Sequence, residues 1–349
     1  MGLRDASDSR LAALTRWVVE DLGFSGSRIE PASADASFRR YFRLTRGGDT
    51  YIVMDAPPNR EDVTPFVSVA RILAGMNLNV PIVLASDAAN GLLLLSDLGS
   101  CQYLDELRAD READRLYGDA LAALVVMQTA GGTAARGLPV YDRALLLREM
   151  ELLPEWFLGR HLRVAVTDHE RGVLDRVFGA LVEAALSQPL TFVHRDYHSR
   201  NLLVTAENNP GILDFQDAVL GPITYDAVSL LKDCYIVWPP ERVRGWLLDY
   251  RHKLKAAGMD VGGDAADFLR WFDLTGLQRH IKVLGIFARL YHRDGKPGYL
   301  KDLPRVLDYA IATAAAYPET AEFAEFLNQR IYPEFRDAQR RAGANPASA

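Results

Sequence analysis

Cysteine is scarce in this sequence, because only Cys101 and Cys234 occur among its 349 residues, far apart and in no metal-ligand spacing. This argues against a disulfide framework and predicts two reduced thiols in a cytoplasmic protein. Long apolar runs are also missing, since runs such as Leu92–Leu95 are far too short to span a bilayer. The N-terminal residues mix charges early, so we expect no signal peptide and no membrane partner.

A basic surplus is absent as well. The chain has 40 basic and 46 acidic residues, a net charge of −6, which argues against a nucleic-acid partner. Hydrophobic residues make up 49% and charged residues 25%, which is ordinary for a globular protein. Lysine is missing from the whole chain before Lys232.

The spacing of apolar residues changes near residue 98. Before it, an amphipathic helix that ends at Gly23 precedes short runs typical of strands. These runs are Ser37–Leu44, Tyr51–Met54, Val80–Ala85 and Leu92–Ser96, with a helix at 65–75. In the first run, Phe38, Phe42 and Leu44 share one face. After residue 98 the pattern predicts helices at about 103–130, 142–160, 168–187, 224–236, 240–257, 264–292, 302–315 and 319–341, interrupted by strands at 190–216.

This organisation predicts an α+β protein of two lobes. Residues 1–98 are expected to form a small β-rich lobe and residues 99–341 a large, mostly helical one, followed by a frayed tail at 342–349. No internal repeat is visible. Ligands commonly bind in a cleft between two such lobes.

One short stretch carries the residues expected to do chemistry. Leu202–Val204 and Ile212–Phe215 are apolar runs separated by a turn-forming segment, so they predict a hairpin. This pairing brings Asn201 and Asp214 together on adjacent strands. An amide and a carboxylate oxygen suit Mg²⁺. Asp196, five residues before Asn201, can accept a proton from an incoming hydroxyl.

These residues resemble a known family. His194-Arg-Asp196 with Asn201 fits the H-x-D-x-x-x-x-N catalytic loop, and Asp214-Phe-Gln fits the metal-binding triplet of kinases. The continuation through Gly221-Pro222, without a protein-kinase activation segment, is similar to the aminoglycoside phosphotransferase and choline kinase family. The resemblance implies a protein kinase-like fold, with ATP and Mg²⁺ as cofactors, and covers nearly the whole chain.

The resemblance also implies roles for individual residues. Asp196 would orient or deprotonate the acceptor, and Asn201 and Asp214 would hold Mg²⁺. The adenine pocket would be lined by Leu95–Leu98, with Ser96, Asp97 and Leu98 as cofactor-binding residues. A loop at Ser33–Ser37, including Ser37, would cover the phosphates.

Two departures concern the phosphates. The loop at Ser33–Ser37 has no glycine, and Met54 stands where the family has a phosphate-binding lysine. We expect Arg39 or Arg43 to replace that lysine, since a guanidinium suits phosphate geometry at least as well as an ammonium.

Other residues have two interpretations. A metallohydrolase with His194, Asp196, His198 and Asp214 as metal ligands is an alternative use of the same loop. Asp217 is expected either to contact a substrate hydroxyl or to cap a turn. His198 is expected to make a polar contact below the site.

The basic residues between 278 and 291 form either a solvated helix face or one side of the acceptor pocket. If they face the pocket, Lys282 or Arg289 would meet an acidic acceptor.

Further similarity, at Met54-Asp-Ala-Pro-Pro58 and Arg293-Asp-Gly-Lys296, is to the branch of the family that acts on amino sugars. It implies a kinase that phosphorylates the anomeric hydroxyl of N-acetylmuramate or N-acetylglucosamine in peptidoglycan recycling. We separately expect a cytoplasmic monomer. The alternatives are a kinase for aminoglycosides or choline-like amines, and a pseudokinase that binds nucleotide without catalysis.

Overall fold

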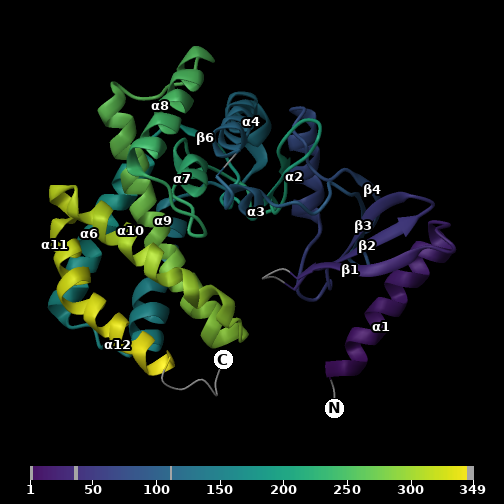
Figure 1. Cartoon of the computed structure of the whole chain (residues 1–349), viewed down its shortest axis with the longest axis horizontal. Helices are drawn as coiled ribbons and strands as arrows, with labels where there is room; N and C mark the ends of the chain where they lie inside the picture. The colour runs from purple at the N-terminus through teal and green to yellow at the C-terminus, as the bar shows by residue number, and fades with distance from the viewer. Residues whose placement is uncertain (1–2, 35–37, 111, 344–349) are drawn as a thin grey trace. The chain divides into compact units, whose positions relative to one another are not determined.

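The structure is a computed structural model that describes residues 3–34, 38–110 and 112–343 (Figure 1). The chain forms two compact units. The first contains residues 1–106 together with 200–217, and the second contains 107–199 together with 218–349. The segment 200–217 therefore belongs with the N-terminal residues, although the sequence pattern placed it with the helical part. Residues 342 and 343 of the predicted tail belong to the last helix, and residues 344–349 lie outside the described residues, so fraying there stays a prediction.

The first unit is built on a five-stranded antiparallel sheet. Its strands are β1 (Arg28–Ala34), β2 (Arg40–Arg46), β3 (Asp49–Asp55), β4 (Val83–Asp87) and β5 (Leu92–Ser96), in the order β1-β2-β3-β5-β4. Gly47 and Gly48 connect β2 to β3 with φ angles of 60° and 104°, which glycine adopts without strain. The register pairs Tyr41 with Met54 and Arg43 with Ile52. The predicted β-rich N-terminal region is confirmed.

Alternation along the strands gives this sheet two different faces. Phe42, Leu44 and Val53 are buried on one face against α1 (Leu3–Arg16) and the π-helical turn η1 (Trp17–Asp21). Tyr41, Arg43 and Ile52 lie on the other face and line a cavity. Phe38, expected on the apolar face, is instead 56% exposed, because β2 begins only at Arg40.

The hairpin of β7 (Leu202–Leu203) and β8 (Gly211–Ile212) is fastened to the first unit by main-chain hydrogen bonds. Val204 N donates to Cys101 O and Ile212 N donates to Asn79 O, both at 2.8 Å. The ring of Phe215 packs 4.8 Å from that of Phe66 in α2 (Thr64–Gly75). The hairpin is thereby held against the rest of the first unit.

The second unit is mostly helical. Its elements are α4 (Ala113–Ala134), η2 (Ala135–Gly137), α5 (Arg143–Met150), η3 (Leu153–Leu162), α6 (Asp168–Leu186), β6 (Leu190–Val193), β9 (Val219–Pro222), α7 (Tyr225–Leu231), α8 (Pro240–Ala256), α9 (Ala265–Asp294), η4 (Pro297–Asp302), α10 (Leu303–Ala315), η5 (Pro318–Thr320), α11 (Ala321–Phe326), η6 (Leu327–Ile331) and α12 (Tyr332–Gly343). The chain passes from the first unit to the second within the short helix α3 (Tyr103–Leu107). The predicted helix at 103–130 is wrong in one respect, because it is broken between α3 and α4.

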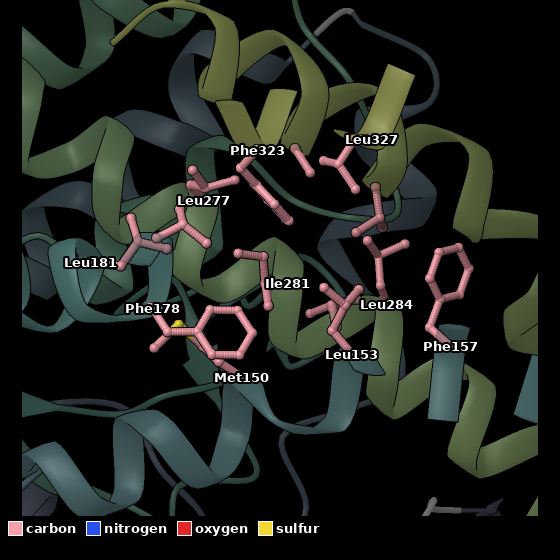
Figure 2. Close-up of a cluster of buried hydrophobic side chains, with 14 of the residues drawn as sticks. Met150, Leu153, Phe157, Phe178, Leu181, Leu277, Ile281, Leu284, Phe323 and Leu327 are labelled. Carbon is pink, nitrogen blue, oxygen red and sulfur yellow. The ribbon is translucent and has the colours of Figure 1, made fainter. Parts of the chain in front are cut away.

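Helix α9 is the central element of this unit. Asp264 caps its start by accepting from Ala266 N and Asp267 N, and Gly295 ends it with a φ of 65°. It packs against α5, η3, α6, α7 and α10. Figure 2 shows Leu277, Ile281 and Leu284 of α9 meeting apolar side chains of the surrounding helices. No helix among the described residues is long and apolar enough to cross a membrane.

Replacing Gly285 with alanine is expected to destabilise the fold. An added Cβ would lie 2.4 Å from the carbonyl carbon of Leu152, so α9 and η3 would have to separate. We expect Gly285→Ala to lower the free energy of unfolding by about 1–3 kcal/mol in urea denaturation followed by circular dichroism. The matched control is Gly245→Ala in α8, where nothing lies within 4 Å. This control should raise stability by about 0.5–1 kcal/mol, and equal effects would contradict the prediction.

Candidate active site

A cavity of about 280 Å³ lies within the first unit, under the polar face of the sheet. Strand residues Tyr41, Arg43 and Ile52 form one wall of it, and the hairpin residues Asn201 and Asp214 form another. The segment that follows β5 also lines it, including Ser96, Asp97 and Leu98. The three predicted adenine-pocket residues are therefore gathered at the cavity.

The segment after β5 is held by its own hydrogen bonds. Ser96 Oγ accepts from Ile82 N at 2.8 Å, and Asp97 Oδ1 accepts from Gly99 N at 2.9 Å. Arg43 donates to both carboxylate oxygens of Asp97, at 2.6 and 3.1 Å. Burial alone would raise the pKa of Asp97, but the hydrogen bonds from Arg43 and Gly99 hold it below its ordinary value. Arg43 is therefore engaged with the loop.

Asn201 and Asp214 come together as the hairpin prediction requires. Leu202 pairs with Ile212, Leu213 N donates to Asn201 O, and Asn201 Nδ2 lies 3.3 Å from Asp214 Oδ2. Rotation of the amide about its last torsion presents an oxygen in place of the nitrogen. An amide oxygen and a carboxylate at this separation fit a hard cation such as Mg²⁺, which takes oxygen ligands and keeps several waters.

Arg39 forms an ion pair with one member of this pair, Asp214. Its Nη2 lies 3.5 Å from Asp214 Oδ1, and its side chain is only 9% exposed. The next arginine, Arg40, pairs instead with the fully buried Asp55, which also accepts from Arg10. Met54 is fully buried in β3. Ser37 lies outside the described residues, so its expected role at the phosphates stays a prediction.

Asp196 lies in the second unit, in the loop after β6. Its carboxylate is 3.5 Å from Arg279 of α9, and its side chain is 38% exposed. Burial acts to raise the pKa of Asp196, but the charges of Lys282, Arg279, His198 and Arg195 outweigh it and hold the pKa well below its ordinary range. Asp196 is therefore ionised at neutral pH and open to an acceptor.

Two buried carboxylates hold the backbone around Asp196. Asp226 accepts from His194 N at 2.6 Å and from Arg195 N at 2.9 Å, and Asp233 accepts from Ser199 N at 3.0 Å. Arg195 has a φ of 77°, which a residue with a side chain rarely adopts, so these bonds stabilise a strained loop. Burial raises the pKa of Asp226 to about 7, although the two N–H donors favour its charged form.

A second buried charge cluster lies beside the loop. Glu149 is 3.0 Å from Lys282 Nζ and also pairs with Arg195 and the Tyr141 hydroxyl. Burial works against the charge of Glu149, but these partners hold its pKa below the ordinary value. Lys282 also donates to Tyr225 Oη at 3.1 Å. The predicted solvated helix face is therefore wrong for Arg279 and Lys282, which are 4% and 5% exposed.

The remaining predicted residues have different surroundings. His198 is buried, with its ring 5.3 Å from that of Tyr235, and Asp217 is exposed beside Gln216. Arg289 is half-buried on α9. Within the described ranges, no group of three or more His, Cys, Asp or Glu side chains is placed to hold a metal ion. The metallohydrolase alternative therefore gains no support.

Sequence reasoning missed Glu149 and Arg195 as members of the site. Glu149 is separated by 46 residues from its partner Arg195, so no local pattern links them. A weak signal existed for Arg279 and Lys282, because they lie on the same helix as the core residues Leu277 and Ile281. Charged residues in such a helix are buried only with partners of opposite charge.

Comparison with known proteins assigns the chain to a family. The model of the phosphotransferase enzyme family (APH) matches residues 28–272. This chain therefore belongs to the phosphotransferase enzyme family.

Three relatives bear the same name, N-acetylmuramate/N-acetylglucosamine kinase. The protein of Pseudomonas putida is 46% identical over 92% of this chain and 96% of its own length. That of Pseudomonas aeruginosa is 51% identical over 86% of this chain and 88% of its own length. That of Neisseria meningitidis is 41% identical over 87% and 90%.

Solved structures support the fold. The GDP complex of aminoglycoside 2'-phosphotransferase-IIIa matches with a TM-score of 0.60 at 17% identity, covering 88% of this chain and 99% of that one. The ethanolamine kinase of Plasmodium vivax matches with a TM-score of 0.63 at 10% identity, covering 89% and 90%. The prediction of an α+β, protein kinase-like fold of the phosphotransferase and choline kinase type is confirmed.

Removing the Asp226 carboxylate is expected to destabilise the Asp196 loop. In Asp226→Ala the N–H groups of His194 and Arg195 lose their acceptor, so the free energy of unfolding should fall by about 2–4 kcal/mol. Urea denaturation measures this loss. Asp260→Ala is the control, because it removes an acceptor for Gly262 N at an exposed turn and should change stability by about 0.5 kcal/mol or less. Equal losses would show that Asp226 does not hold the loop.

Proposed function

We propose that this chain is an ATP-dependent kinase that phosphorylates the anomeric (C1) hydroxyl of N-acetylmuramate, N-acetylglucosamine or both, as a step of peptidoglycan recycling. The observation that carries the kinase proposal is the Asn201–Asp214 pair at the wall of a cavity, 3.3 Å apart, which suits metal-bound phosphates. The sugar is supported by the name of relatives that are 41% to 51% identical.

Asp196 is proposed as the base that accepts the proton of the sugar hydroxyl. An anomeric hydroxyl is more acidic than an ordinary alcohol, so a plain carboxylate is a sufficient base. Arg279, 3.5 Å away, keeps that carboxylate charged and oriented. The buried Asp226 and Asp233 fix the loop backbone, which places the base before the acceptor binds.

Asn201 and Asp214 are proposed to hold Mg²⁺. When bound there, the ion neutralises charge on the transferred phosphoryl group and its neighbours. The backbone between Ser96 and Leu98, which lines the same cavity, is proposed to bind the adenine. ATP is an intracellular substrate, so we place the enzyme in the cytoplasm. We also propose that it acts as a monomer.

Arg39 is proposed to take the place of the phosphate-binding lysine. It points at Asp214, whereas Arg43 is held by Asp97 and Arg40 by Asp55. A guanidinium can bind two phosphate oxygens at once, so it compensates for the apolar side chain of Met54.

Removing the Asp196 carboxylate should abolish turnover. In Asp196→Asn we expect kcat to fall about 100- to 10,000-fold, because the amide cannot accept the proton. ADP release is followed with ATP, Mg²⁺ and a panel of N-acetylated sugars, aminoglycosides and choline. ATP affinity, measured by calorimetry, should stay unchanged, and Asp249→Asn on the exposed face of α8 is the matched control.

Turnover of only the cationic acceptors would overturn the sugar assignment. ATP binding by the wild-type chain without any turnover would favour the pseudokinase.

Nucleotide binding distinguishes the two arginines. We expect Arg39→Met to weaken the binding of MgATP about 10- to 100-fold and to leave adenosine affinity unchanged, because only the phosphates lose a charged donor. Arg43→Met should weaken ATP and adenosine by similar factors, since it frees the loop at Asp97. Calorimetry measures both. A phosphate-selective loss in Arg43→Met alone would assign the role to Arg43.

A further inference from the structure

Three basic side chains lie along α9 from the turn that contacts Asp196 towards the end of the helix. Arg279 is paired with Asp196 and donates to Ser229 Oγ at 2.6 Å. Lys282 is paired with Glu149 and donates to Tyr225 Oη. Both charges are thus balanced by buried protein groups, and Lys282 is not available to an acidic acceptor.

The third basic side chain, Arg289, has different surroundings. Across the described ranges it makes no ion pair, and its buried Nε has no hydrogen-bond partner. Burial lowers the pKa of Arg289, and the positive charge of Arg293 lowers it further. The more distant carboxylates of Asp294, Glu155 and Glu149 only partly offset this decrease in pKa. A half-buried guanidinium with a buried N–H left unbonded is costly unless an anion completes it.

Arg289 follows Lys282, whose charge acts on Asp196, along the same helix. Lys282 and Arg289 are seven residues apart, hence on one side of the helix and about 10 Å apart along its axis. Helical side chains lean toward the N-terminus, so Arg289 leans toward the Lys282 end. Asp196 itself is paired with Arg279, ten residues before Arg289, so N-acetylmuramate would extend along the helix from its C1 hydroxyl to its lactyl group.

The relatives' name supplies two acceptors that differ at one group. N-acetylmuramate is N-acetylglucosamine with a lactyl ether, which adds one carboxylate. We propose that Arg289 binds this carboxylate and so sets the preference between the two sugars. The inference rests on the proposed sugar kinase function and adds the residue that distinguishes its two acceptors.

The proposal predicts a change of preference and not a general loss. In Arg289→Met, the ratio of kcat/KM for N-acetylmuramate to kcat/KM for N-acetylglucosamine should fall about 10- to 100-fold, mostly through KM for N-acetylmuramate. Arg289→Lys keeps the charge and should recover part of the ratio. Arg293→Met is the matched control, because Arg293 is exposed one turn further on and pairs with Asp294; its ratio should equal that of the wild type.

Equilibrium binding of each sugar, measured by calorimetry on the same folded variants, separates the two proposals. If the wild-type chain binds N-acetylmuramate through Arg289 without phosphorylating either sugar, the kinase function fails and the inference stands. An unchanged ratio in Arg289→Met, or an equal loss for both sugars, overturns the inference while leaving the kinase function intact. Failure of both sugars to bind overturns both.

Discussion

The conformation of the Asp196 loop depends on the hydrogen bonds that His194 N and Arg195 N donate to the buried carboxylate of Asp226. They hold Arg195 at a φ of 77°. In this loop conformation the Arg195 side chain pairs with Glu149, and the Asp196 carboxylate pairs with Arg279. A carboxylate suits this place because it accepts from two successive N–H groups. The loop is thus fixed by the fold before any substrate arrives.

Arginine side chains neutralise several buried carboxylates of this chain. Asp55, Asp97 and Glu149 are each buried or nearly so, and each is paired with at least one guanidinium. Such pairs cost desolvation energy, and removing one partner leaves an uncompensated charge. In this chain, which has no lysine before Lys232, arginine therefore provides both the partners of the buried carboxylates and the side chain that faces Asp214.

Local features of the sequence were predictable, and long-range ones were not. The Asn201–Asp214 approach followed from two apolar runs and a turn, and periodicity predicted α9 to within about two residues at either end. The grouping of the hairpin with the N-terminal unit depends on bonds such as Ile212 N to Asn79 O, which no spacing reveals. Periodicity gave the faces of α9 but not the partners of Arg279 and Lys282, because those partners come from distant segments.

The packing of α1 and η1 on the sheet has a practical consequence. Leu14, Trp17 and Val18 cover the apolar strand residues Phe42 and Val53, and Arg10 of α1 supplies one of the two cations that neutralise Asp55. A recombinant version shortened to begin at the first strand would expose a contiguous apolar surface and weaken a buried ion pair. The N-terminal helix is thus an integral part of the first unit, and shortened versions are expected to aggregate.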